Sequence, residues 1–357
     1  MIKQILYYRI IDQIGHGGMG RVYRAIDERK NAKVRDVAIK VLKSELMDDR
    51  DIITRFIREP LIEAKLSGQP NIIDILEFGV PKGTVDKFNL YGELGRYRTT
   101  LLEQENEHDQ WYYITMKYMK GGDLESRIRN SGKMSLKMVY RILNCIGDAL
   151  DYTHKYGYIH RDIKSSNIVF DEYDTPYLTD FGVAKAVSSE NGMTSVGTVI
   201  GTLEYMAPEQ LMDKNVDYRC DIYSMGIVLY QMLVGKVPFA VDSKNNQSSE
   251  YIRIELMKKI MDMKPPKIKS HRPDCPSSLE KVVLKMLEKD PEKRYGSFKE
   301  IKSNIKNTSN IESVRLLQTT KNARHNHRAK KGNYLAALWL SILLTFVIIL
   351  LLEIIKI

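Results

Sequence analysis

The sequence predicts an α+β protein with two lobes, a small strand-rich lobe followed by a larger helical one. The first third alternates β-branched and aromatic runs with glycine or polar turns, a pattern typical of strands joined by hairpins. From about residue 120 to residue 308, apolar residues recur at three- and four-residue spacing, which indicates amphipathic helices. With 357 residues, the chain is long enough for two such lobes and an appendage. We therefore expect one domain at residues 8–308, with an N-lobe at 8–119 and a C-lobe at 120–308.

The small lobe is expected to contain three strands, one helix and then two more strands. The strands correspond to YYRIIDQIG, GRVYRAIDE, VRDVAIKVLK, IIDILEFG and WYYITMKYM, and the helix to residues 49–66. A polar insertion at residues 81–110 separates the last two strands and is longer than an ordinary hairpin loop. We expect this insertion to be a flexible surface excursion, with a docking or regulatory element as the alternative.

The helical lobe is predicted from three long segments with helical periodicity. They are MSLKMVYRILNCIGDALDYTHKYG, VDYRCDIYSMGIVLYQMLVG and SSLEKVVLKMLEKDPEKR. The three cysteines, Cys145, Cys220 and Cys275, are far apart and fit no zinc-binding spacing, which suits core positions in a reducing compartment.

The net charge of +10 does not indicate nucleic-acid binding, because much of it lies in one short segment. Without that segment's six basic residues the rest of the chain carries only +4, and no basic stripe with interleaved aromatics remains. The six residues are Arg315, Lys321, Arg324, Arg328, Lys330 and Lys331. We therefore expect no nucleic-acid partner.

An apolar run next to this basic segment predicts a transmembrane helix. The 18 residues from Leu335 to Leu352 contain no ionisable side chain. A helix of that length rises about 27 Å, close to the thickness of the hydrocarbon core. We expect a basic juxtamembrane linker at 309–333, a transmembrane helix at 334–353 and a short extracytoplasmic tail at 354–357. The basic flank predicts a single-pass protein of the cell membrane with its folded domain in the cytoplasm.

A glycine-rich stretch, IGHGGMGRVY, predicts a loop that covers a nucleotide. Its glycines follow the pattern G-x-G-x-x-G-x-V, and the missing Cβ atoms let backbone N–H groups approach phosphates. A dinucleotide site would continue as a helix, whereas RVYRAID continues as a strand, so we expect a hairpin. The residues expected at the nucleotide here are Ile14, Gly15, Gly17, Gly18, Gly20 and Val22.

The next strand carries Lys40 in the sequence VAIK, where a lysine is unusual among apolar residues. Strand alternation places Lys40 on the same face as Ala38, from which it could point at phosphates. A carboxylate from the following helix must orient this lysine, and Glu59 is our choice. Pro60 removes a backbone donor directly after Glu59 and disfavours a helical conformation there, so Glu63 stays open as the partner.

The stretch HRDIKSSN places Asp162, Lys164 and Asn167 close together, and on its own it could be a charged turn. It is followed in order by Asp180 in TDFG and by Glu209 in APE. With this set of motifs the chain resembles the protein kinases over about residues 8–308. The D-x-K-x-x-N loop resembles the Ser/Thr-specific branch. GHGGMGRVY, RFIRE, GTLEYMAPEQ and the single transmembrane helix resemble the Hanks-type membrane kinases of bacteria.

The resemblance implies a two-lobed protein-kinase fold and ATP- and Mg²⁺-dependent phosphoryl transfer to serine or threonine of protein substrates. Asp162 would accept the hydroxyl proton, and Lys164 would steady the transferring group. Lys40 would hold the α- and β-phosphates, while Asn167 and Asp180 would bind Mg²⁺.

The same resemblance implies an adenine site and two structural contacts. Val22, Ala38 and Val169 would enclose the adenine, Lys117 and Met119 would meet its edge in front of Met116, and Asp123 would meet the ribose. Asp221 would brace the catalytic loop, and Arg294 would pair with Glu209.

Activation is expected to depend on phosphorylation of the segment between TDFG and APE. Arg161 precedes Asp162, and in kinases with that arrangement it pairs with a phosphate on this segment. The candidate acceptors are Thr194, Ser195 and Thr198, whereas Thr202 is expected to bond Asp162 and Lys164. Transfer between two copies, in a transient homodimer, is the simplest source of the phosphate. The alternatives are a membrane-bound pseudokinase scaffold and a small-molecule phosphotransferase of kinase-like fold.

Overall fold

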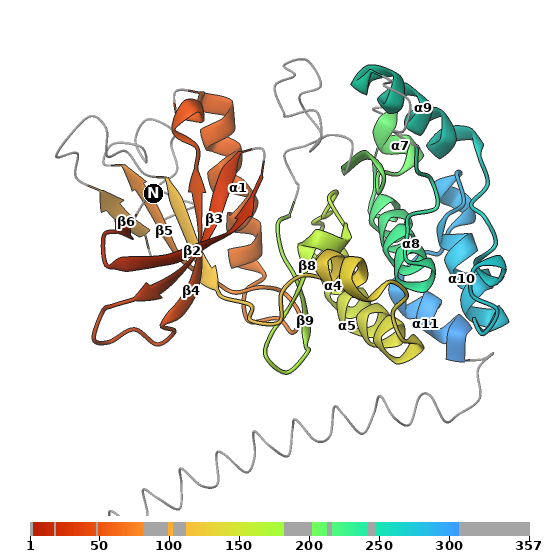
Figure 1. The fold of residues 1–357 in the computed structure, drawn as a ribbon, viewed down its shortest axis with the longest axis horizontal. Coiled ribbons are helices and arrows are strands. Elements are labelled where there is room, and N and C mark those ends of the chain that lie inside the picture. Colours follow the sequence, from red (N-terminus) through yellow and green to blue (C-terminus); the bar gives the residue numbers. More distant parts are fainter. Residues whose placement is uncertain are drawn as a thin grey trace, which may run out of the picture. The chain divides into compact units, whose positions relative to one another are not determined.

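The computed structural model describes residues 3–17, 19–47, 49–81, 99–102, 112–181, 202–212, 216–241 and 248–306 (Figure 1). For residues 55, 58–60, 81 and 99–102 it describes the backbone alone. The predicted linker, transmembrane helix and tail at 309–357 lie outside these ranges. Within the ranges, no helix is both long enough and apolar enough to cross a membrane.

The small lobe is built on one seven-stranded sheet with the strand order β1-β2-β3-β4-β7-β5-β6 (Figure 1). All neighbouring strands are antiparallel except β5 and β6, which are parallel. The strands are β1 Gln4–Ile5, β2 Tyr8–His16, β3 Gly20–Asp27, β4 Asp36–Leu42, β5 Ile75–Pro81, β6 Thr99–Leu102 and β7 Tyr113–Lys117. The five predicted strands correspond to β2, β3, β4, β5 and β7 and are confirmed.

Strand β6 lies within the predicted polar insertion and was not expected from the sequence. It pairs with β5 from Phe78 opposite Thr99 to Pro81 opposite Leu102. Its four residues, TTLL, are β-branched or apolar, but they are flanked by strongly polar stretches. This part of the insertion therefore extends the sheet, while the rest of it lies outside the described residues.

The two faces of the sheet are buried in two separate apolar clusters, as the alternation along β4 requires. Ala38 and Leu42 belong to the cluster that also contains Phe56 of the helix. Ile39 and Val41 belong to the cluster on the opposite face. Lys40 alternates with Ile39 and so shares the face of Ala38, as predicted.

Helix α1, Arg50–Lys65, packs on the sheet and agrees with the predicted helix at 49–66. It begins after Asp49, whose carboxylate accepts hydrogen bonds from the N–H groups of Asp51 at 2.9 Å and Ile52 at 3.1 Å. The helix continues through Pro60. The residue before Pro60 is thus helical despite the steric bias against it, because packing against the sheet outweighs that local preference.

On the other face of the sheet, the buried carboxylate of Glu77 in β5 connects several strands through hydrogen bonds. Glu77 is 1% exposed and accepts hydrogen bonds from Tyr113 at 3.1 Å, Tyr8 at 3.3 Å and Arg29 at 2.9 Å. Arg29 also pairs with the buried Asp27. These charge-assisted bonds tie the hairpins at one edge of the sheet to its centre.

The larger lobe is helical and surrounds α8 (Figure 1). Helix α8 is buried on all sides, from Cys220 to Val234, which places it at the centre of the lobe. The helices are α4 Leu124–Ser131, α5 Leu136–Lys155, α7 Pro208–Leu211, α8 Arg219–Val234, α9 Ser249–Asp262, α10 Ser277–Met286 and α11 Phe298–Lys306. The three predicted helical segments correspond to α5, α8 and α10.

A short hairpin of β8, Ile168–Phe170, and β9, Pro176–Leu178, links the lobes and leads directly into Asp180. Leu178 donates its N–H to the carbonyl of Asn71 at 2.8 Å, and Ile73 donates to the carbonyl of Leu178 at 3.0 Å. The segment entering β5 is thereby paired with the strand that carries Asp180 toward the small lobe.

Candidate active site

The glycine-rich stretch forms the turn between β2 and β3, as predicted. Gly17 donates its N–H to the carbonyl of Gly20 at 2.8 Å, which closes the hairpin. A Cβ on Gly20 would lie 2.7 Å from the carbonyl oxygen of Val41, so no larger residue fits there without a shift. Ile14 is exposed at this edge, and Gly18 lies outside the described residues.

The catalytic-loop side chains gather around one carboxylate. Lys164 lies 2.9 Å from Asp162 Oδ2, and the amide nitrogen of Asn167 donates to the carbonyl and to Oδ2 of Asp162, at 2.8 and 3.2 Å. Lys164 Nζ is also 3.5 Å from the hydroxyl of Thr202, at the limit of hydrogen-bonding distance. A substrate hydroxyl approaching Asp162 would therefore meet a base and a cation together.

The backbone of this loop is held by Asp221 of α8. Its carboxylate accepts hydrogen bonds from His160 N–H at 2.9 Å, Arg161 N–H at 2.8 Å and His154 Nε2 at 2.8 Å. Burial would raise the pKa of Asp221, but the hydrogen bond and charge of His154 lead the interactions that leave it lowered. Arg161 has a positive φ of 63°, and Asp221 holds this unfavourable conformation in place.

Lys40 of β4 and Asp180 form an ion pair across the two lobes at 2.6 Å. Partial desolvation of this half-exposed carboxylate would raise the pKa of Asp180, but the Lys40 ammonium outweighs it and leaves the pKa lowered. Asp180 also has a positive φ, of 59°. The Lys40 side chain therefore reaches the site from the sheet face on which the sequence placed it.

Glu63, the alternative carboxylate of α1, is buried beside this ion pair. It is 2% exposed and accepts a hydrogen bond from the N–H of Phe181 at 2.9 Å. Burial, followed by the charge of Asp180, raises the pKa of Glu63 to about 8, although Phe181 N–H and Lys40 oppose the shift. The Glu59 side chain lies outside the described atoms. The contact between Glu63 and Phe181 was not foreseen, because no local sequence signal marks a tertiary backbone partner.

Asn167 and Asp180 have the donor atoms that a magnesium ion requires. The amide nitrogen of Asn167 is used by Asp162, which leaves its oxygen directed elsewhere. Asp180 pairs with Lys40 through Oδ1, and its side chain is 42% exposed. Among the described residues no group of three His, Cys, Asp or Glu side chains forms a metal cage. Two oxygen ligands suit Mg²⁺, which keeps waters and takes further ligands from phosphates.

The residues expected around an adenine ring share one apolar cluster. Ala38, Met116 and Met119 are buried in it, and Val22 and Val169 pack against it. Lys117 ends β7. Asp123 caps α4 by accepting the N–H of Ser126 at 2.7 Å, so its carboxylate is fixed in orientation at the edge of this group.

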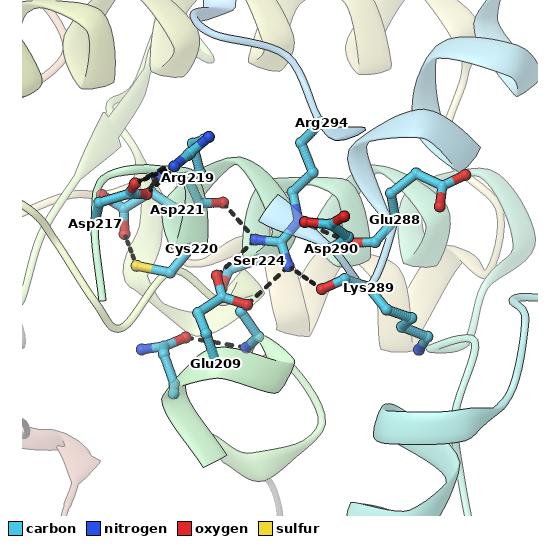
Figure 2. Close-up of polar contacts among 12 residues, drawn as sticks. Glu209, Asp217, Arg219, Cys220, Asp221, Ser224, Glu288, Lys289, Asp290 and Arg294 are labelled. Carbon is cyan, nitrogen blue, oxygen red and sulfur yellow. Dashed lines mark hydrogen bonds and ion pairs between the residues drawn. The ribbon is translucent and has the colours of Figure 1, made fainter. Parts of the chain in front are cut away.

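The segment after the activation loop is anchored by Arg294, which pairs with Glu209 as expected (Figure 2). The two side chains form a bidentate ion pair at 2.6 and 2.8 Å and are almost fully buried. Arg294 also donates to three backbone carbonyls, those of Arg219, Glu288 and Lys289. The predicted phosphorylation sites Thr194, Ser195 and Thr198 lie outside the described residues.

Comparison with known proteins agrees with this arrangement. A protein kinase domain profile matches residues 8–305. The chain is 36% identical over 303 residues to a probable serine/threonine-protein kinase of Clostridium acetobutylicum, covering 85% of this chain and 40% of that protein. It is 32% identical over 299 residues to serine/threonine-protein kinase PrkC of Bacillus subtilis, covering 84% and 40% of the two chains.

A third relative is serine/threonine-protein kinase PknB of Mycobacterium tuberculosis, 32% identical over 306 residues, which cover 85% of this chain and 43% of that protein. The match thus spans about two fifths of the length of each of these relatives. The resemblance found in the sequence is confirmed, and the chain belongs to the protein kinase family.

Proposed function

We propose that the protein is an ATP- and Mg²⁺-dependent serine/threonine kinase that acts on protein substrates. The proposal rests on two groups of charged and polar side chains that the structure brings together where the lobes meet. Lys164 and Asn167 surround Asp162, and Lys40 meets Asp180. Phosphoryl transfer needs charge neutralisation at the phosphates and a nucleophile held in line, and these groups supply both.

Each residue has a separate part in this reaction. Asp162 orients the substrate hydroxyl and takes its proton, while Lys164 neutralises charge on the transferring group. Lys40 holds nucleotide phosphates, and Asn167 and Asp180 hold Mg²⁺, which neutralises phosphate charge when bound. A pseudokinase scaffold would lack at least one of these groups, and all of them are present in this chain.

We also propose that the activation loop is phosphorylated by a second copy of the protein. Arg161 Nε is buried and has no hydrogen-bond partner within the described part of the chain. A phosphate on Thr194, Ser195 or Thr198 would bring three acceptor oxygens and about −1.5 to −2 charges to such a group. Anchoring by a helix at 334–353, with the kinase domain in the cytoplasm, would raise the effective concentration of the two copies.

Replacing Asp162 with asparagine tests the proposed function. We expect Asp162→Asn to lower phosphoryl transfer to a casein-like protein by at least about 10²-fold, since general-base groups contribute about 10² to 10⁴. Binding of Mg·ATP, measured by calorimetry, should change little because Lys40 and Asp180 remain. Mass spectrometry should find the loop phosphorylated in the wild type and unmodified in the variant.

The matched control is Asp148→Asn, which removes a largely exposed carboxylate of α5 and should leave transfer unchanged. Transfer reduced less than about tenfold in Asp162→Asn, against the 10² to 10⁴ of a general base, would contradict the assignment of the base. Faster transfer to sugars or aminoglycosides than to protein would instead favour a small-molecule phosphotransferase.

A further inference from the structure

One buried carboxylate connects helix α1 to the backbone that carries Asp180. Glu63 lies in the last turn of α1, and its Oε1 accepts the N–H of Phe181 at 2.9 Å. This bond joins the end of a helix to a loop 118 positions further along the chain, and it is buried on both sides.

The backbone next to this hydrogen bond, at Asp180, has an unfavourable conformation. Asp180 has φ of 59°, a left-handed conformation that an aspartate adopts only where its surroundings enforce it. Its side chain is held by Lys40 at 2.6 Å. The ring of Phe181 is fully buried and packs on His160, with ring centroids 4.4 Å apart. Glu63 supplies the remaining constraint, on the peptide groups themselves.

Burying the Glu63 carboxylate costs free energy, and its hydrogen bond to Phe181 compensates part of that cost. A carboxylate buried at 2% exposure is desolvated, and it also faces the like charge of Asp180. A leucine would fill the same place in the apolar surroundings of α1 without either penalty, but it would leave the buried N–H of Phe181 without an acceptor.

We propose that Glu63 is a positioning residue for phosphoryl transfer, which acts by holding the Asp180–Phe181 peptide in its left-handed turn. What matters at this position is an oxygen that accepts the N–H of Phe181, and a negative charge opposite Lys40 is secondary. The position of α1 thereby determines where the Asp180 carboxylate points. The consequence for catalysis rests on the proposed kinase function, whereas the attachment itself does not.

Amide exchange measured by NMR on the full-length protein, without nucleotide, tests the attachment. Labelling with ¹⁵N-phenylalanine reports only eight backbone amides, among them those of Phe181 and Phe170. Phe170 donates to the carbonyl of Gly122 at 2.8 Å and serves as an internal reference. The variants are Glu63→Leu, which removes the acceptor, and Glu63→Gln, which keeps an acceptor oxygen. Lys65→Met, an exposed change on the same helix, is the control.

We expect Glu63→Leu to speed exchange of the Phe181 amide by about tenfold or more relative to Phe170, equivalent to about 1.4 kcal/mol. Glu63→Gln and Lys65→Met should stay within about threefold of the wild type. In kinetic assays Glu63→Leu should raise KM for Mg·ATP by about tenfold, while Glu63→Gln should recover most of the loss.

Two results would overturn the proposal. The first is an unchanged Phe181 amide in Glu63→Leu, and the second is a glutamine variant as impaired as the leucine variant, which would make Glu63 an ion-pair partner. If the leucine variant unfolds, the amides of Phe170 and Phe181 both exchange fast, and Glu63→Gln is then compared with the wild type. A KM for Mg·ATP and a Phe181 exchange rate within about threefold of the wild type support the proposal, and a rise of about tenfold in either contradicts it. The expected exchange pattern in a protein that transfers no phosphate would instead refute the kinase function and leave the attachment standing.

Discussion

Two residues of the candidate active site, Arg161 and Asp180, have positive φ angles, of 63° and 59°. Neither has glycine's freedom, so each conformation depends on partners far away in the sequence. Asp221 accepts the N–H of Arg161, and Glu63 accepts the N–H of Phe181 directly after Asp180. Strain at these two residues is therefore balanced by buried carboxylates, which couples the catalytic geometry to the packing of α8 and α1.

A third carboxylate near the site, Glu204, has no such compensation. It follows Thr202 in the chain, and within the described part of the structure it makes no hydrogen bond or ion pair. Burial, followed by the charge of Glu125, raises the pKa of Glu204 to about 7. Its ionised form is thus disfavoured in the folded protein.

This shift predicts a stability change that depends on pH. Between pH 4.5 and 7 the folded protein retains a proton on Glu204 that the unfolded chain has released, so stability falls as pH rises. The penalty is fully present above pH 7. Glu204→Gln should therefore raise the free energy of unfolding at pH 8, by about 1–3 kcal/mol, and leave it unchanged at pH 4.

Urea denaturation at the two pH values measures this difference. Glu172→Gln, at an exposed loop position, is the control and should have no effect at either pH. An equal gain for Glu204→Gln at both pH values would show that packing and not ionisation is responsible.

At the scale of elements, two ion-pair groups beside α8 differ strongly in burial. Arg294 and Glu209 are 0% and 7% exposed, and every donor of the guanidinium has an acceptor. Arg219 bridges Asp217 and Glu292, but Glu292 is 76% exposed. The first pair connects α7 to the segment before α11, and the second lies at the surface.

Burial predicts that these two pairs differ strongly in their effect on stability. Arg294→Met leaves the Glu209 carboxylate buried without a partner and should lower the free energy of unfolding by about 3–5 kcal/mol. Arg219→Met should lower it by less than about 1 kcal/mol, since solvent screens the exposed pair.

Chemical denaturation of both variants, of Glu209→Gln and of the double variant Arg294→Met/Glu209→Gln checks this expectation. The double variant should be less destabilised than the two single changes together by at least about 1 kcal/mol, because its partners are coupled. Additive effects would show that the ion pair is not the source of the loss.

At the scale of the whole molecule, residues Met1–Ile305 form one compact unit. Its last element, α11, contributes Phe298 and Ile301, both 0% exposed, to the core of the larger lobe. Asp151 of α5 accepts the N–H groups of Phe298 and Lys299 at 2.8 Å each, which fixes the start of α11. The core of the unit is thus completed before the predicted linker begins.

This completeness predicts that the chain can be shortened without loss of the fold. A protein ending at Gly332 should remain folded and active, with a Tm within about 2 °C of the full chain, because a core of this size does not depend on the apolar tail. A protein ending at Tyr295 should fail to fold, since it lacks α11. Calorimetry and kinase assays distinguish the two, and an aggregated, inactive Gly332 variant would show that the tail contributes to the domain.

The sequence by itself determined most of the secondary-structure elements and the candidate site residues, because both depend on local patterns. Alternation along β4 placed Lys40 on the same face as Ala38, and glycine spacing followed by a strand identified the hairpin. The motifs HRDIKSSN, TDFG and APE, in that order, carry the resemblance to the protein kinases, and this resemblance implies roles for Asp162, Asn167 and Asp180. Strand β6 was not predicted, because its few apolar residues lie in a long polar stretch.

Only the tertiary structure decided the contacts made between distant segments. The helix continues through Pro60 because the sheet packs against it, although local preference opposes helix at that point. Glu63 and Phe181 N–H are 118 positions apart, and Lys40 and Asp180 are 140 apart. No periodicity or propensity records which backbone N–H a buried carboxylate will meet, since that depends on how helix, sheet and loop pack together.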